Sequence, residues 1–237
     1  MDKMKDLEEF LEKECLIERK RVLELLPLYY LYMKNLLTLN EKINLTAIKE
    51  EKEFILKHYI DSLYIMKNEN VFKSNDRVLD LGTGGGFPGI PLAILNSHVS
   101  FTLLDSVGKK LRAVDAASKD LNLKNIDFIN ERAEVLSREE DHREKYNKVV
   151  SRAVADLKIL SELALPLLKK EGSFFSYKGQ KGKEEIENAK GHIKALGGEI
   201  VNIIMYSYKG IREHMIIEIV KLHNTDKRYP RQMKDIK

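Results

Sequence analysis

The sequence predicts an α/β protein with a Rossmann-like, doubly wound architecture: a seven-stranded, mostly parallel sheet with an N-terminal helical extension. Two observations predict it. A short apolar run is followed by five glycines within eight residues, and strand-like and helix-like segments then alternate along the chain. Such alternation is typical of a parallel sheet covered by helices. We expect a helical cap at residues 1–72, an α/β domain at residues 73–222 and a basic tail at residues 223–237.

The N-terminal cap contains no convincing strand, and its apolar side chains recur at helical spacing. Pro27 is expected to start or kink a helix there, because proline lacks a backbone donor. Residues 40–48 break the helical pattern. His58 and Asp61 follow, three residues apart, so a helix would place them on one face. They could form a metal or catalytic pair, but we favour a pair that packs or caps within the fold.

The glycine-rich stretch lies between a predicted strand at residues 77–81 and a predicted helix at residues 90–95. Glycine allows sharp turns, positive φ and close approach of the backbone to a ligand, because it has no Cβ. A strand, a glycine turn and a helix N-terminus together form a nucleotide-binding crevice at the carboxyl edge of a parallel sheet. We therefore expect a nucleotide-type cofactor here.

The sequence pattern of the glycine stretch fits two cofactors, a dinucleotide and S-adenosylmethionine. Gly84 begins the dinucleotide pattern G-x-G-x-x-G, and Asp105 lies 21 residues later, where a ribose-binding acid is expected. The same stretch also spells D-x-G-x-G from Asp80 to Gly84, which is how the first motif of S-adenosylmethionine (SAM) methyltransferases looks. The motif alone does not separate the two.

The later elements do separate them. Further strands are expected at residues 100–104, 125–129, 148–150, 172–177, 199–206 and 214–220, and helices at 109–121, from Asp156 towards 168, and at 183–196. The last two strands follow each other directly, which favours an antiparallel final strand, the usual finish of a class I SAM-dependent methyltransferase sheet. A dehydrogenase would need a second domain for its substrate, and no residues remain to build one. SAM is therefore the expected cofactor.

Composition narrows the class of protein further. The 237 residues are 43% hydrophobic and 33% charged, as is ordinary for soluble proteins. No apolar run approaches the roughly 20 residues that span a bilayer. Cys15 is the only cysteine, which excludes disulfides and cysteine-rich zinc sites. We expect a cytoplasmic monomer without a metal or a membrane partner. Residues 221–237 hold six basic residues against two acidic ones, so they suit either a polyanionic partner or a solvated terminus.

Six motifs occur in order: N-L-T at 44–46, H-Y-I-D-S-L at 58–63, L-D-L-G-T-G-G-G-F-P-G-I-P at 79–91, T-L-L-D-S at 102–106, S-R-A at 151–153 and Y-K-G at 177–179. From about residue 20 to Arg231, the chain resembles the RsmG (GidB-type) family of 16S ribosomal RNA guanine-N7 methyltransferases. The resemblance implies SAM as the cofactor and 16S ribosomal RNA, within the small ribosomal subunit, as the partner. One departure is that the tail lacks the glycine- and proline-rich ending of many relatives.

The expected cofactor residues come from the glycine turn and from the ends of later strands. They are Gly82, Gly84, Phe87, Asp105, Ala133, Glu134 and Arg152. The resemblance implies that Gly82 and Phe87 contact SAM and that Arg152 stands beside the cofactor at the end of the fourth strand. It also implies that Ala133 and Glu134 line the adenine.

The resemblance implies a reaction that needs no catalytic acid or base. Guanine N7 carries its own lone pair and has no proton to lose, so alignment with the sulfonium methyl group can suffice. Methylation of an exocyclic base amine usually goes with an N/D-P-P-Y/F signature after the fourth strand, but S-R-A-V stands at 151–154. Methylation of pyrimidine C5 needs a cysteine nucleophile, but Cys15 has no such motif around it. A small-molecule methyltransferase and a non-catalytic RNA-binding module remain as alternatives.

Overall fold

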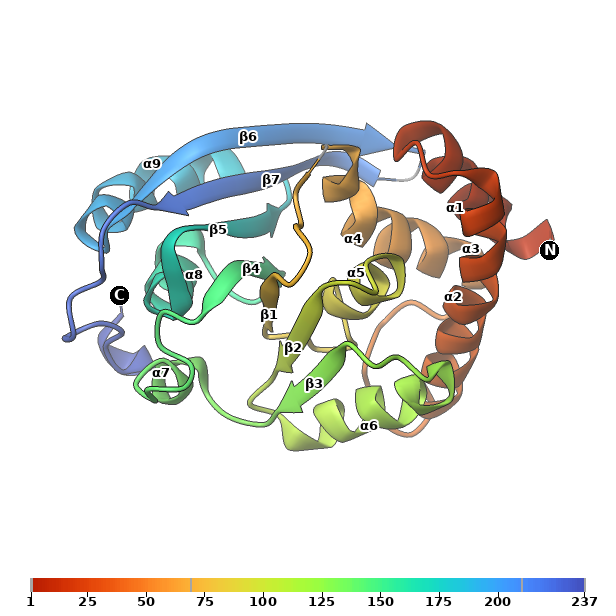
Figure 1. Cartoon of the computed structure of the whole chain (residues 1–237), viewed down its shortest axis with the longest axis horizontal. Helices are drawn as coiled ribbons and strands as arrows, with labels where there is room; N and C mark the ends of the chain where they lie inside the picture. The colour runs from red at the N-terminus through yellow and green to blue at the C-terminus, as the bar shows by residue number, and fades with distance from the viewer. Residues whose placement is uncertain (1, 69, 210, 237) are drawn as a thin grey trace.

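The computed structural model describes residues 2–68, 70–209 and 211–236 and shows a seven-stranded sheet between two layers of helices (Figure 1). The predicted cap and tail therefore each include residues that lie outside the described part, namely 1 and 69 in the cap and 237 in the tail. The strands are β1 (Arg77–Leu81), β2 (Ser100–Leu104), β3 (Ile126–Ile129), β4 (Tyr146–Arg152), β5 (Leu168–Lys178), β6 (Gly198–Tyr208) and β7 (Ile211–Lys221). Their order in the sheet is β3-β2-β1-β4-β5-β7-β6. Strand β7 runs antiparallel to the strands on both of its sides and the remaining pairs are parallel, so the predicted fold class is confirmed.

Nine α-helices are assigned in the described residues. They are α1 (Lys5–Glu9), α2 (Arg19–Asn40), α3 (Glu51–Phe54), α4 (Asp61–Leu63), α5 (Gly89–Leu95), α6 (Gly108–Ser118), α7 (Ala133–Leu136), α8 (Leu157–Ala164) and α9 (Gly182–Ala195). Two π-helical turns, Phe10–Glu14 and Ile55–Ile60, continue α1 and join α3 to α4. Helix α8 follows Asp156 as predicted, and the Asp156 side chain caps it by accepting a hydrogen bond from the backbone N–H of Lys158.

Of the two expectations for Pro27, the start of a helix is wrong. Pro27 lies inside the 22-residue helix α2 and does not start it. A proline at this position removes the hydrogen bond to the carbonyl of Leu23, four residues earlier. Leu23 is 36% exposed, so water can reach this turn of the helix. The opposite side of α2 is anchored by buried side chains such as Tyr29, and this packing keeps the helix continuous through the proline.

Both faces of the central strands are buried, and consecutive strand residues point to opposite sides. In β1, Val78 belongs to the core that the N-terminal helices, α5 and α6 cover, whereas Leu79 belongs to the core beneath α8 and α9. Both side chains are completely inaccessible to solvent. The first of these cores contains residues of the predicted cap and of the α/β domain together, so the cap is packed directly onto the sheet.

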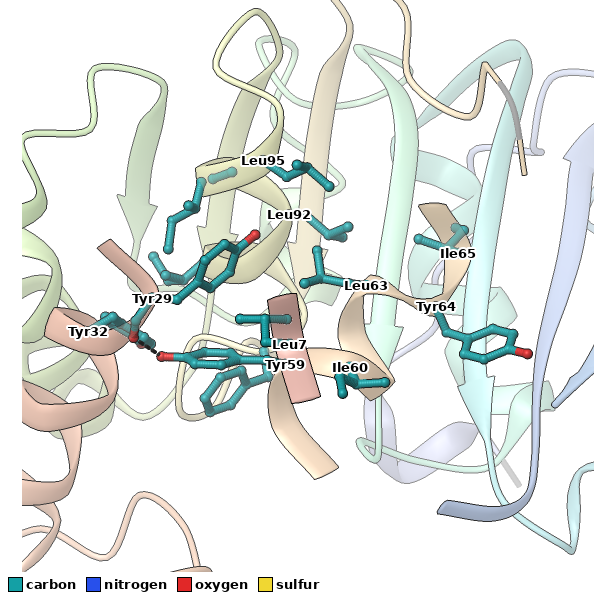
Figure 2. Close-up of a cluster of buried hydrophobic side chains, with 14 of the residues drawn as sticks. Leu7, Tyr29, Tyr32, Tyr59, Ile60, Leu63, Tyr64, Ile65, Leu92 and Leu95 are labelled. Carbon is teal, nitrogen blue, oxygen red and sulfur yellow. Dashed lines mark hydrogen bonds between the residues drawn. The ribbon is translucent and has the colours of Figure 1, made fainter. Parts of the chain in front are cut away.

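Three buried tyrosines connect the N-terminal helices to one another and to the rest of the chain. Tyr29 donates a hydrogen bond to the carbonyl of Pro91 (2.9 Å), and Tyr32 donates one to the carbonyl of Gly85 (2.9 Å). Figure 2 shows Tyr59, whose hydroxyl group donates to the backbone carbonyl of Tyr29 (2.6 Å). Burial raises the pKa of all three phenols well above the usual value, so they remain neutral donors. Helix α2 is thereby fixed against the glycine turn and the start of α5.

The C-terminal residues fold back along α7 and α8 (Figure 1). We call residues 223–236 the tail segment. Arg138 donates to the carbonyl of Pro230, and Arg143 donates to the carbonyls of Thr225 and Tyr229. Ile236 is buried in the core beneath α8 and α9. Within the described residues, no helix combines the length and apolar character needed to cross a membrane.

Candidate functional site

The carboxyl ends of β1 and β4 meet where the strand order reverses, which is where open α/β sheets bind ligands. A cavity of about 520 Å³ lies at this edge, and we call it the cofactor cavity. All seven residues predicted for the cofactor line it: Gly82, Gly84, Phe87, Asp105, Ala133, Glu134 and Arg152. The structure therefore brings together residues that are up to 70 positions apart in the chain.

The glycine turn needs glycine for two different reasons. Gly82 (φ +74°) and Gly84 (φ +57°) both adopt the left-handed conformation that other residues rarely take. A Cβ added at Gly82 would lie 2.5 Å from Cγ2 of Val154, so that position has no space. At Gly84 the nearest atom to an added Cβ is the carbonyl oxygen of Gly82, 4.0 Å away. The backbone at Gly84 is therefore open towards the cofactor cavity.

Asp105 fixes the shape of this turn. One carboxylate oxygen accepts a hydrogen bond from the backbone N–H of Gly84 (2.9 Å), and the other accepts one from Val107 (2.8 Å). Each carboxylate oxygen has a second lone pair, so Asp105 can accept further hydrogen bonds from a ligand in the cavity. The residue predicted to bind ribose thus also holds the glycine turn against the β2–α6 connection.

Phe87 forms an apolar wall of the cavity. Its ring is 5% exposed and stacks on the His58 imidazole, with centroids 4.3 Å apart and planes 8° from parallel. The guanidinium carbon of Arg152 lies 5.2 Å from the centre of the same ring. Phe54 and Tyr32 pack against it edge-on. The side chain is therefore held in one orientation by the cap.

Arg152, at the end of β4, points to the cap. Its guanidinium donates to the carbonyl of Lys57 (2.9 Å) and to Oδ2 of Asp61 (2.9 Å), and Nη2 lies 3.0 Å from Nδ1 of His58. A guanidinium has no acceptor, so His58 Nδ1 must accept and its Nε2 must carry the hydrogen, which is donated to Thr46 Oγ1 at 2.7 Å. Burial and the charge of Arg152 lower the pKa of His58 to about 3. His58 is therefore neutral, and its two ring nitrogens connect Thr46 of the cap to Arg152.

Asp61 joins four elements through one carboxylate. Oδ2 binds Arg152, and Oδ1 accepts from the hydroxyl of Tyr206 (2.8 Å) and from Nδ1 of His214 (2.8 Å). Burial opposes its ionisation, but the hydrogen bonds and the charge of Arg152 outweigh burial and lower the pKa of Asp61. His58 and Asp61 are thus linked through Arg152. Among the described residues, no group of three or more histidine, cysteine, aspartate or glutamate side chains is placed to hold a metal ion.

Some walls of the cofactor cavity were not predicted from the sequence. Leu45, from the loop between α2 and α3, and Met233, from the tail segment, both line it, as do Val154 and His58. Leu45 belongs to the N-L-T motif at 44–46, but that motif predicts no role for it. Met233 carries no local signal at all, because its position depends on contacts of the tail segment with residues far away in the sequence.

Comparison with known sequences supports a specific relationship. A family model described as rRNA small subunit methyltransferase G (GidB) matches residues 26–216. Ribosomal RNA small subunit methyltransferase G of Clostridium tetani (strain Massachusetts / E88) is 42% identical over 194 residues, which cover 81% of each chain. The protein of the same name from Alkaliphilus metalliredigens (strain QYMF) is 41% identical over 203 residues, covering 85% of this chain and 84% of the relative.

Comparison with solved structures supports the fold. A variant of the 16S rRNA (adenine(1408)-N(1))-methyltransferase from Catenulisporales acidiphilia matches with a TM-score of 0.51 and 14% identity, covering 65% of this chain and 88% of that one. A fibrillarin/Nop5p complex matches with a TM-score of 0.55 and 15% identity, covering 70% and 82%. MtNAS in complex with MTA and tNA matches with a TM-score of 0.56 and 15% identity, covering 82% and 71%.

Proposed function

This chain belongs to the rRNA small subunit methyltransferase G (GidB) family, and we propose on that basis that it transfers a methyl group from SAM to N7 of a guanine in 16S ribosomal RNA. The observation that carries this proposal is the cofactor cavity, which gathers all seven residues expected for SAM at the carboxyl edge of the sheet. The family relationship supplies the substrate, because a shared fold alone does not specify one.

The residues of the cavity fit SAM. Its volume of about 520 Å³ is in the usual range for small-molecule sites. The glycine turn leaves open backbone at Gly84, and an added Cβ there would occupy ligand space. Asp105 supplies acceptors for ribose hydroxyls, next to the N–H of Gly84. Phe87, Val154 and Met233 supply apolar walls. When bound, SAM would provide an activated methyl group on a sulfonium.

The chain's own residues position the reactants and do not move protons. Guanine N7 attacks with its own lone pair, so no general base is needed. The His58 imidazole is neutral, but Arg152 donates to Nδ1 and the Nε2 hydrogen points to Thr46, so its ring nitrogens are engaged within the fold. Arg152 and Asp61 form an ion pair at the cavity wall, 2.9 Å apart. The ion pair is neutral overall, so the wall does not oppose a positive charge that moves from sulfur to the purine.

The target is a base within structured RNA, and we propose that the protein meets it as a monomer on the small ribosomal subunit in the cytoplasm. Sequence-specific RNA recognition generally uses bases that are splayed out of loops. A base presented in this way can enter a cavity at the edge of the sheet.

The test maps 7-methylguanosine in 16S ribosomal RNA from cells with the protein, cells without it, and cells that carry Gly84→Val or Gly191→Val. Gly191 is the control, because an added Cβ there meets no atom within 4 Å and the residue is exposed on α9. We expect one 7-methylguanosine to be lost in the cells without the protein and in those with Gly84→Val, but kept with Gly191→Val. An unchanged methylation map in cells lacking the protein would refute the proposed function.

The cofactor is tested separately with purified protein. S-adenosylhomocysteine should raise the melting temperature of the wild type and of Gly191→Val, because it binds the native state preferentially. NAD should not. Gly84→Val should unfold cooperatively without a response to S-adenosylhomocysteine. A response to NAD alone would instead support the dehydrogenase reading of the glycine motif.

A further inference from the structure

A second cavity, of about 590 Å³, opens beside the cofactor cavity, and we call it the base cavity. The two cavities share the side chains of His58, Arg152, Ala153 and Val154, which form a seam between them. The base cavity extends from this seam to the end of β5 and to His214 on β7. A molecule in it would lie next to the part of the cofactor cavity that Arg152 borders.

Two ion pairs form the walls of the base cavity. Arg152 and Asp61 are 2.9 Å apart, with side chains 14% and 5% exposed. Lys178 and Glu185 are 2.7 Å apart, with side chains 7% and 19% exposed. Desolvation offsets much of the attraction within such buried pairs, so they add little to stability on their own. Their position around one cavity instead suits the recognition of a polar, uncharged ligand.

The ammonium group of Lys178 binds the chain directly after the seam. It donates to the carbonyl of Ala155, which follows Ala153 and Val154 in the chain, and it also pairs with Glu185. Glu185 is itself fixed, because it accepts a hydrogen bond from the backbone N–H of Leu157 (2.7 Å). An ammonium group has three protons. Two of them serve these partners, and the third can be donated to a ligand in the base cavity.

Guanine has hydrogen-bond acceptors that the Lys178 ammonium group could bind. Its N7 and O6 are neighbouring acceptors on one side of the purine. If N7 faces the seam, O6 faces the wall next to it. N7 must keep its lone pair free for methyl transfer, so a donor belongs at O6 and not at N7. Lys178 offers such a donor, and Arg152 has most of its donors engaged by the cap.

We propose that the base cavity receives the target guanine and that Lys178 donates a hydrogen bond to its O6. The inference rests on the proposed function, since it assigns the substrate to a part of the same site. Adenine carries an amino group in place of O6, and two donors would then face each other. Lys178 would thus select guanine over adenine while N7, common to both bases, performs the attack.

The test replaces the acceptor and the donor in turn. Ribosomal RNA is reconstituted into subunits with either guanosine or 2-aminopurine riboside at the mapped position; 2-aminopurine keeps N7 but lacks O6. Lys178→Met should lower kcat/KM on guanosine about 10- to 100-fold, as expected for a lost hydrogen bond to a charged donor. The wild type should lose a similar factor with 2-aminopurine. For Lys178→Met, replacing guanosine by 2-aminopurine should lower kcat/KM by a factor at least ten times smaller than for the wild type, because the donor to O6 is already absent.

Two further variants keep the test decisive. Lys190→Met removes an equally charged but exposed lysine on α9 and should retain the wild-type preference for guanosine. In Lys178→Met alone, the Glu185 carboxylate loses its ion-pair partner. If that variant does not respond to S-adenosylhomocysteine, the double variant Lys178→Met with Glu185→Gln takes its place, because it leaves no unpaired carboxylate. Equal losses with 2-aminopurine in the wild type and in a Lys178 variant would overturn this inference alone. A wild type that methylates no guanosine would overturn the proposed function as well.

Discussion

At the scale of a single residue, Asp80 shows how a buried side chain fixes the glycine turn by hydrogen bonds. It lies at the fourth position of β1 and is inaccessible to solvent. Its Oδ2 accepts from the hydroxyl of Thr83 (2.6 Å) and from the backbone N–H of Gly89 (2.8 Å), whereas Oδ1 is buried without a hydrogen-bond partner. Burial outweighs these two hydrogen bonds and raises the pKa of Asp80 to about 7.

Asp80→Asn tests this pKa. The native carboxyl group keeps its proton up to about pH 7, whereas in the unfolded chain it loses it near 3.8. Between these values the native state binds more protons, so the free energy of unfolding falls as the pH rises, by at most about 1.4 kcal/mol per pH unit. An asparagine oxygen in place of Oδ2 keeps both hydrogen bonds and does not titrate.

We therefore expect Asp80→Asn to gain stability relative to the wild type as the pH rises from about 5 to about 7, because over this interval the carboxyl group is protonated in the native state and ionised in the unfolded chain. Urea unfolding followed by circular dichroism at several pH values measures the difference. Asp127→Asn, at an exposed position of β3, is the control and should show no such trend. A difference between Asp80→Asn and the wild type that does not vary with pH would contradict a raised pKa for Asp80.

At the scale of an element, the tail segment contributes a wall of the cofactor cavity. Arg231 is held by Glu162 of α8, which is inaccessible to solvent: its guanidinium binds both carboxylate oxygens, at 2.9 and 2.6 Å, and its backbone N–H binds one of them at 2.7 Å. His192 of α9 binds the same carboxylate (2.7 Å). Two residues further along the chain, Met233 lines the cofactor cavity. The charge of Arg231 is therefore used within the protein.

Arg231→Ala should release this part of the tail segment and weaken the binding of S-adenosylhomocysteine. Loss of the apolar contacts of one methionine corresponds to about 1 kcal/mol, or roughly a fivefold rise in Kd. Calorimetry measures the change. Arg228→Ala is the matched control, since the Arg228 side chain is 68% exposed, and it should bind as the wild type does. Equal Kd values in all three proteins would show that the tail segment does not contribute to the site.

The elements differ in how far the sequence determines them. All seven strands were predicted, because each contains an apolar run, although β4, β5 and β7 begin earlier than expected. The added pairing of Tyr146 in β4 with Leu168 in β5 lies beyond a register shift that no periodicity reveals. That the seven expected residues line the cofactor cavity was predictable, because they follow strands at motif positions. The place of Met233 was not, since it is set by the buried charge of Glu162 in a distant helix.

At the scale of the whole molecule, the cofactor cavity has walls from both ends of the chain. Leu45 lies before the first strand and Met233 after the last. Helix α2 is bonded to the glycine turn through Tyr32, and α4 is bonded to β4, β6 and β7 through Asp61. The cap, the sheet and the tail segment are thus mechanically connected around one ligand site.

Hydrogen exchange should reveal this connection. We expect S-adenosylhomocysteine to slow amide exchange in the glycine turn and also around residues 45 and 233, because a ligand that contacts all three segments suppresses the local opening of each. Mass spectrometry of the exchanged protein locates the protection. Residues 169–171 of β5, which lie at the amino end of that strand and do not line the cofactor cavity, serve as the internal reference. Protection confined to residues 82–134 would contradict a site shared by the two ends of the chain.

The position of Met233 also bears on the order in which the protein is made. Translation proceeds from the N-terminus, so residue 233 leaves the ribosome after every other residue that lines the cofactor cavity. The sheet and the glycine turn can form earlier, but the pocket is complete only when the tail segment has reached Glu162. The cofactor cavity of a nascent chain therefore lacks one of its walls until residue 233 has been synthesised.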